Sequence, residues 1–176
     1  MPEITTKLID VGTVLQARLP SLKHYPAVLV RFLIWSLRTL VNEDRINQFL
    51  QKHGYLNGFD FIDQVFDELQ LDYLVRHDEI KNIPVTGRVL IVANHPLGGL
   101  DGLALLRLVG KTRRDVSIVV NELLFNINSL KSMFLPVDAF SGETDKADLE
   151  RIITALNQDR AVIMFPAGAV SRAGSK

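Results

Sequence analysis

Two short sequences carry the side chains of this chain that are best suited to chemistry. In the first, NHPLGGLDG at residues 94–102, an imidazole lies six positions before a carboxylate, and Gly98 and Gly99 allow the chain to fold back between them. A carboxylate that accepts the Nδ1 proton of a histidine fixes its tautomer and leaves Nε2 able to take a proton from a hydroxyl. His95 is therefore the candidate general base, and Asp101 is its candidate orienting partner.

The nucleophile that fits this pair is an alcohol of the substrate. The chain has no cysteine and no G-x-S-x-G sequence, so we expect direct transfer without a covalent enzyme intermediate. Loop amides around Gly98 and Gly99 are candidates to hold an oxyanion. A second interpretation stays open: Asp101 directly precedes the apolar run 102–109, so it also suits the N-cap of a helix, with His95 in an ordinary structural hydrogen bond.

The second sequence, FPAGAVSR at residues 165–172, has the residue types of an anion site. Gly168 lets backbone amides approach a ligand, and Ser171 and Arg172 can donate to phosphate oxygens. An ordinary turn with a solvated arginine is the alternative for this segment.

Both sequences follow apolar runs, which predict the elements that position them. We expect strands over 71–76, 88–93, 116–120 and 161–165, with helices over 102–109 and 146–158. The run Val89–Val92 has the composition of a strand buried on both faces. Alternating strands and helices predict an α/β fold whose mostly parallel or mixed central sheet is flanked by helices. Ligands of such sheets bind beyond the carboxyl ends of the strands, where both sequences begin.

The first third of the chain has a helical period instead. Apolar residues at spacings of three and four predict helices over 27–41, 44–52 and 60–69. We therefore expect an N-terminal helical cap over 1–70 and an α/β core over 71–176.

Composition narrows the classes of function. The 176 residues carry 20 Lys+Arg and 20 Asp+Glu, so no net charge favours a nucleic acid as partner. The absence of cysteine excludes disulfides, thiol catalysis and cysteine-ligated metal, and we expect no metal site. The N-terminus lacks the pattern of a signal peptide, which predicts a cytoplasmic protein.

The charge is unevenly distributed along the chain. Residues 18–41 hold four basic side chains, one histidine and no acid, whereas residues 60–82 hold seven acids against two basic side chains. Arg31 and Arg38 lie seven apart on one helical face with Trp35 near them, so the helix suits a membrane interface. A core helix whose arginine stems reach out to water fits equally well. On the first interpretation, segment 18–41 holds the protein peripherally on the inner face of the cell membrane.

Taken together, the motifs resemble the glycerolipid acyltransferase superfamily, which includes glycerol-3-phosphate and lysophosphatidic acid acyltransferases. Its Asn-His…Asp block is similar to Asn94-His95 with Asp101, its second block to residues 134–138, and its Phe-Pro-Glu-Gly-Thr-Arg-Ser block to residues 165–172. The sequences of the two motifs, NHPLGGLDG and FPAGAVSR, look most like those of a bacterial branch described as hemolysin-like or lysophospholipid acyltransferase-like.

The resemblance implies O-acyl transfer from acyl-CoA or acyl carrier protein, as co-substrate and without a bound cofactor, to a hydroxyl of a lysolipid or glycerol-phosphate-type acceptor. It implies that His95 is the general base, that Asp101 orients it, and that Gly168, Ser171 and Arg172 bind the acceptor phosphate. The family's fourth block would follow Arg172 by tens of residues, so the expected core is incomplete at its C-terminus.

The chain departs from the family pattern at four points. Five residues separate His95 from Asp101 where the family has four, and Ala139, Ala167 and Ala169 stand where an arginine or an acid is expected. Two rivals follow: a non-catalytic lipid-binding or interaction module with a degenerate site, and a hydrolase that uses His95 and Asp101 to activate water.

Overall fold

The computed structural model describes residues 10–94, 96–121, 124, 127–137 and 146–166 of the 176-residue chain. The chain divides into two compact units, Met1–Tyr55 and Leu56–Lys176. Each unit is described by itself.

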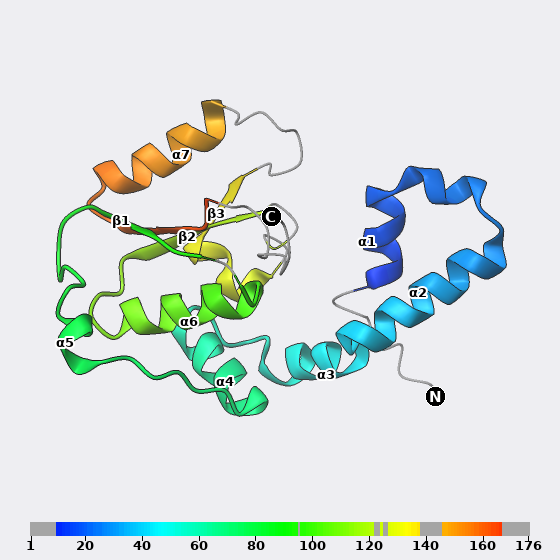
Figure 1. The fold of residues 1–176 in the computed structure, drawn as a ribbon, viewed down its shortest axis with the longest axis horizontal. Coiled ribbons are helices and arrows are strands. Elements are labelled where there is room, and N and C mark those ends of the chain that lie inside the picture. Colours follow the sequence, from blue (N-terminus) through cyan, green and yellow to red (C-terminus); the bar gives the residue numbers. More distant parts are fainter. Residues whose placement is uncertain (1–9, 95, 122–123, 125–126, 138–145, 167–176) are drawn as a thin grey trace, which may run out of the picture. The chain divides into compact units, whose positions relative to one another are not determined.

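The second unit is built on a four-stranded sheet (Figure 1). Its strands are β1 (Val89–Val92), β2 (Val116–Asn121), β3 (Phe134–Val137) and β4 (Ala161–Met164), in the order β1-β4-β2-β3. All three pairings are parallel, so every strand ends at the same edge of the sheet. The prediction of an α/β fold with a largely parallel sheet is confirmed.

Helices cover both faces of this sheet. On one face, α6 (Gly99–Gly110) packs on β2 and β4, and α4 (Phe59–Leu69) packs on α6. On the other face, α7 (Lys146–Asn157) packs its buried side chains Ile152 and Ala155 against Val162 of β4. Figure 1 shows α7 on one side of the strands, with α6 and α4 on the other.

The packing of α4 on α6 is close. The ring of Phe59 lies against Gly110, where an added Cβ would come within 2.0 Å of a ring carbon. Arg107 of α6 donates to Asp63 at 2.7 Å and lies over the ring of Phe66. The helix that the sequence placed in an N-terminal cap therefore contacts the α/β core directly.

The predicted strand over 71–76 is wrong. These residues form no strand, and the short helix α5 (His77–Ile80) follows them. Leu74 is fully exposed, so the apolar run there lines no sheet face.

Two of the strands differ from expectation because they lie at the edges of the sheet. β1 is not buried on both faces: Leu90 is 45% exposed and Val92 57% exposed, on the face that α7 covers over β3 and β4. β3 was not predicted, since Pro136 lowers the strand signal of its sequence. An edge strand tolerates proline because one side of it needs no ladder hydrogen bond.

A buried arginine connects the loops at the amino ends of the strands, opposite the edge at which the strands end. The guanidinium of Arg113, between α6 and β2, donates to the Asp115 carboxylate at 2.6 and 2.7 Å. It also donates to the carbonyl oxygens of Pro84, Gly87 and Asp159 at 3.2, 2.6 and 2.6 Å. The bond to Asp115 raises the pKa of Arg113 and lowers that of Asp115. One side chain thus ties together the segments that lead into β1, β2 and β4.

The first unit is helical. It contains α1 (Val11–Arg18), the 3-10 helix η1 (Pro20–His24), α2 (Ala27–Val41) and α3 (Glu43–His53). The helices predicted over 27–41 and 44–52 are confirmed within a residue at each end, whereas α1 and η1 were not predicted. In the part of the chain that the structure describes, no helix combines the length and apolarity needed to cross a bilayer.

Arg38 of α2 forms ion pairs that link α2 to the start of α1 and to α3. Arg38 donates to Asp10 at 2.6 Å and to the buried carboxylate of Glu43 at 3.2 Å. Glu43 also accepts from the backbone N–H of Val11 at 3.0 Å. The Arg38 hydrogen bond lowers the pKa of Asp10 to about 2.

Candidate active site

The sheet brings the two chemical motifs together at one edge. β1 and β4 are neighbours, with Val92 opposite Met164, and the N–H of Ala93 donates to the carbonyl of Met164 at 3.2 Å. Neighbouring strands lie about 4.8 Å apart. The segments that begin at Asn94 and Phe165 therefore leave the sheet side by side, although they are far apart in the sequence.

A second contact links the same two segments through α6. Gly102 is buried, and a Cβ added there would lie 3.0 Å from Ile118 Cδ1 and 3.8 Å from Phe165 Cε2. The missing side chain lets the first turn of α6 approach β2 and the start of the second motif. Sequence reasoning gave Gly102 no role; the signal was a glycine inside an otherwise apolar helical run.

Asp101 lies in the first turn of α6, because that helix begins at Gly99 rather than at the predicted Gly102. The residue at the N-cap position is Gly98, so the alternative that made Asp101 the N-cap is wrong. Its Oδ2 accepts from the backbone N–H of Leu97 at 2.7 Å. The carboxylate thus holds the loop between residue 97 and the helix, where negative charge is also favoured by the helix dipole.

The two glycines of the first motif differ in their structural role. Gly98 has φ 68° and ψ −135°, a backbone conformation that L side chains rarely adopt. Gly99 is at an ordinary helical start, and a Cβ there would meet nothing within 4 Å. Gly98 therefore makes the turn, and a side chain at Gly99 would meet no other atom of the described residues. The N–H of Asp101 donates to the Gly98 carbonyl at 3.0 Å, while the N–H groups of Gly99 and Leu100 lack an acceptor within the helix.

The remaining predicted site residues lie outside the described part of the chain. These are His95, Gly168, Ser171 and Arg172, together with the departures Ala139, Ala167 and Ala169. The pairing of His95 with Asp101 accordingly stays a prediction. Among the residues that the structure describes, no three His, Asp or Glu side chains come close enough to share a metal ion.

Acyl transfer without an enzyme nucleophile requires a base for the acceptor hydroxyl and N–H donors for an oxyanion. In the chain, position 95 comes after Asn94, two residues beyond the end of β1, and before Leu97, whose backbone N–H donates to Asp101. Amides at the start of α6 point to the same edge, where they suit an oxyanion that develops on a carbonyl. A site with a base and an oxyanion hole but no enzyme nucleophile suits two substrates: an acceptor with a hydroxyl group and a donor with an activated acyl group.

Comparison with known proteins decides the family. A family model described as an acyltransferase matches residues 13–175. The chain belongs to this acyltransferase family. The resemblance seen in the motifs is thereby confirmed at the level of the superfamily, while the hemolysin-like branch stays a prediction.

Two curated relatives of this acyltransferase are named lyso-glycine lipid O-acyltransferase. One, from Phocaeicola vulgatus, is 32% identical over 167 residues, and the other, from Bacteroides thetaiotaomicron, is 34% identical over 166 residues. Each alignment covers 94% of this chain but only 57% and 59% of the respective relative. The chain therefore spans less than two thirds of the length of these relatives. No solved structure gives a significant match.

Proposed function

We propose that this acyltransferase moves a fatty acyl chain from a thioester, acyl-CoA or acyl carrier protein, to a hydroxyl of a lysolipid. The observation that carries the proposal is the placement of β1 beside β4, which delivers both motifs to one edge of the sheet. The family match and the names of the relatives support the same reaction class.

In the proposed mechanism, His95 Nε2 takes the proton of the acceptor hydroxyl as its oxygen attacks the thioester carbonyl carbon. The C–O bond forms, negative charge develops on the carbonyl oxygen, and amides around Gly98 and Gly99 stabilise it. The C–S bond then breaks, and the leaving thiolate takes the proton from His95. Asp101 orients the imidazole from the first turn of α6. The products are an ester and a thiol, and the enzyme is unchanged.

The acceptor we propose is a lysolipid built on an amino acid rather than glycerol phosphate. The names of both curated relatives specify a lyso-glycine lipid. Gly168, Ser171 and Arg172 would bind the anionic group of this acceptor, because an arginine fork pairs with a carboxylate as well as with a phosphate.

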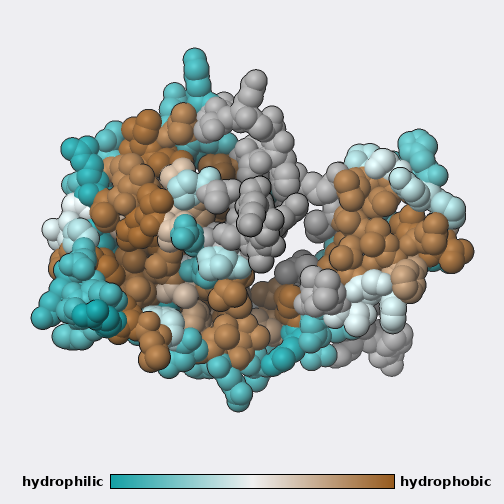
Figure 2. Space-filling model, in the orientation of Figure 1, coloured by the Kyte–Doolittle hydropathy of each residue, from teal (hydrophilic) through white to brown (hydrophobic). Residues whose placement is uncertain are grey.

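The reaction needs access to a membrane, and we propose that segment 18–41 provides it at the inner face of the cell membrane. α2 exposes Val28, Leu29, Phe32 and Trp35, each between 59% and 76% exposed. Figure 2 shows hydrophobic surface over this helical unit. Apolar side chains next to arginines are typical of a helix that lies in the interface.

A matrix of acyl donors and acceptors tests the proposal. The full product of the gene is incubated with acyl-CoA or acyl carrier protein and with either a lyso-glycine lipid or glycerol 3-phosphate. We expect an ester product from the lysolipid that forms in step with thiol release. Thiol release without an acylated product would identify a hydrolase. Lipid binding with no turnover of any donor would identify a non-catalytic module.

A further inference from the structure

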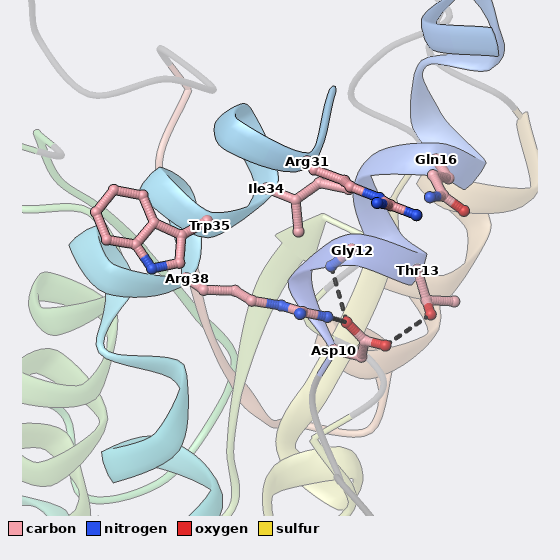
Figure 3. A pocket seen from close by; sticks show the side chains of 8 residues that line it. All are labelled: Asp10, Gly12, Thr13, Gln16, Arg31, Ile34, Trp35 and Arg38. Carbon is pink, nitrogen blue, oxygen red and sulfur yellow. Dashed lines mark hydrogen bonds and ion pairs between the residues drawn. The ribbon is translucent and has the colours of Figure 1, made fainter. Parts of the chain in front are cut away.

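A cavity of about 410 Å³ lies between α1 and α2 in the N-terminal unit (Figure 3). Its size falls within the roughly 300–1,000 Å³ that is usual for small-molecule sites. Arg31, Trp35 and Arg38 of α2 line it, and Asp10, Thr13 and Gln16 line it from the side of α1. The charges of these side chains define what the cavity can bind.

The two arginines that line the cavity differ in their hydrogen-bond partners. Arg38 is occupied, because its guanidinium bonds to both Asp10 and Glu43. Arg31 lies two turns earlier on the same helical face and is exposed. Within the described ranges of the chain, Arg31 has no hydrogen bond and no ion pair. In Figure 3 its side chain reaches from α2 toward α1, on the side of Gln16.

Asp10, the acidic side chain among the described residues that line the cavity, does not neutralise Arg31. Asp10 accepts from Arg38 at 2.6 Å, from the Gly12 N–H at 2.9 Å and from the Thr13 hydroxyl at 3.0 Å. Asp10 is thus held by these bonds, and Arg38 is shared between Asp10 and Glu43. Among the described residues that line the cavity, Arg31 is the arginine left without an ion pair. The Gln16 amide adds N–H donors beside it, so this end of the cavity has the chemistry to bind one anionic group.

The surface next to the cavity favours a lipid as the source of that group. Trp35 lines the cavity and is 62% exposed, and the neighbouring Phe32 and Val28 continue an apolar stripe along α2. A free anion would gain nothing from this stripe, whereas a lipid in a bilayer presents a headgroup anion and apolar chains together. The absence of any acid from residues 18–41 adds charge complementarity to an anionic bilayer.

We propose that this cavity binds the anionic headgroup of a membrane lipid, with Arg31 as its counter-charge and the apolar stripe of α2 against the acyl chains. The site deepens the membrane attachment proposed above and rests on it, but it does not depend on acyl transfer. It would set which bilayers the protein prefers and hold the N-terminal unit at the depth of the headgroups.

Vesicle binding of the whole chain tests the site. Trp35 is the only tryptophan, so its fluorescence reports directly on the cavity. Binding is measured with vesicles of phosphatidylcholine alone and of equal parts phosphatidylcholine and phosphatidylglycerol, without acyl donor. Arg31→Gln is compared with Lys23→Gln, which removes the same charge from the same cationic segment but outside the cavity. Circular dichroism checks that both variants fold.

We expect Arg31→Gln to lower the affinity for the anionic vesicles about tenfold or more, because a charge-assisted bond is lost. Lys23→Gln should lower it about fivefold or less, the size of a general surface-charge effect. Equal losses in the two variants would overturn the headgroup site and leave the attachment standing. Absence of binding to either vesicle would overturn both. A wild-type fluorescence change with inorganic phosphate as large as with anionic vesicles would show a site for a free anion instead.

Discussion

Replacing Asp101 by asparagine separates its structural role from its proposed role in catalysis. The side chain is nearly isosteric, and its amide oxygen can still accept from the Leu97 N–H that Asp101 Oδ2 accepts from at 2.7 Å. The losses to stability are the charge assistance of that bond and the interaction of the carboxylate with the start of α6. Because the bond is exposed, we expect the free energy of unfolding to fall by about 1 kcal/mol or less.

The expected effect on catalysis is much larger. Without the carboxylate, neither the tautomer of His95 nor the imidazolium that forms during transfer is stabilised. General-base catalysis contributes about 10²–10⁴-fold, so the rate should fall by that order, which is about 3–5 kcal/mol on the barrier. The expected loss in activation free energy is therefore several times larger than the expected loss in the free energy of unfolding.

The assay pairs the acyl-transfer rate at saturating donor and acceptor with urea unfolding of the same sample. Asp63→Asn is the matched control, since it removes an exposed carboxylate that pairs with α6 from outside the motif. We expect this control to keep the wild-type rate. If Asp101→Asn also keeps most of the rate, Asp101 only holds the loop at the start of α6, and the proposed dyad is refuted.

Three further substitutions, two of them with a matched control, test the packing and the ion pairs of the two units. Arg113→Met should lower the free energy of unfolding in urea by about 3 kcal/mol, because it leaves buried carbonyl oxygens unpaired, whereas Arg76→Met at an exposed ion pair should cost under about 1 kcal/mol. Gly110→Ala should cost about 1–3 kcal/mol or more, since its Cβ meets an aromatic ring at 2.0 Å, while Gly99→Ala, with open space, should change stability by about 0.5 kcal/mol or less. Asp10→Asn should destabilise the protein by under about 1 kcal/mol, because the ion pair is more than a third exposed. The pKa of Asp10 is lowered from 3.8 to about 2, so this difference should be full above pH 4 and vanish as the pH falls to about 2 in a denaturation series.

The sequence predicted the elements whose apolar pattern is long or continuous. The helix over 146–158 has Ile152 and Leu156 on one face, and the strands over 116–120 and 161–165 are runs of buried residues. Their positions also predicted that the two motifs emerge at the carboxyl edge of the sheet. Only the pairing of β1 with β4 puts them side by side, and strand order depends on contacts distant in sequence.

Other features depend on tertiary contacts that no local pattern reveals. Pro136 concealed β3, which is tolerated because this strand lies at the edge of the sheet. The segment 71–76 is apolar enough for a strand but has no neighbour to pair with in the described fold. Arg113 is an unremarkable arginine in the sequence, and its five hydrogen bonds go to four residues in three separate segments.

We propose that the chain carries an O-acyltransferase site in which His95 removes the proton of the acceptor. Its most direct test is the rate at which an acyl chain from a thioester appears as an ester on a lyso-glycine lipid, measured for the full product of the gene and for its His95→Ala variant. We expect an ester product from the wild type and a rate lower by about 10²–10⁴-fold in the folded variant. Equal rates of ester formation by the two proteins would contradict it.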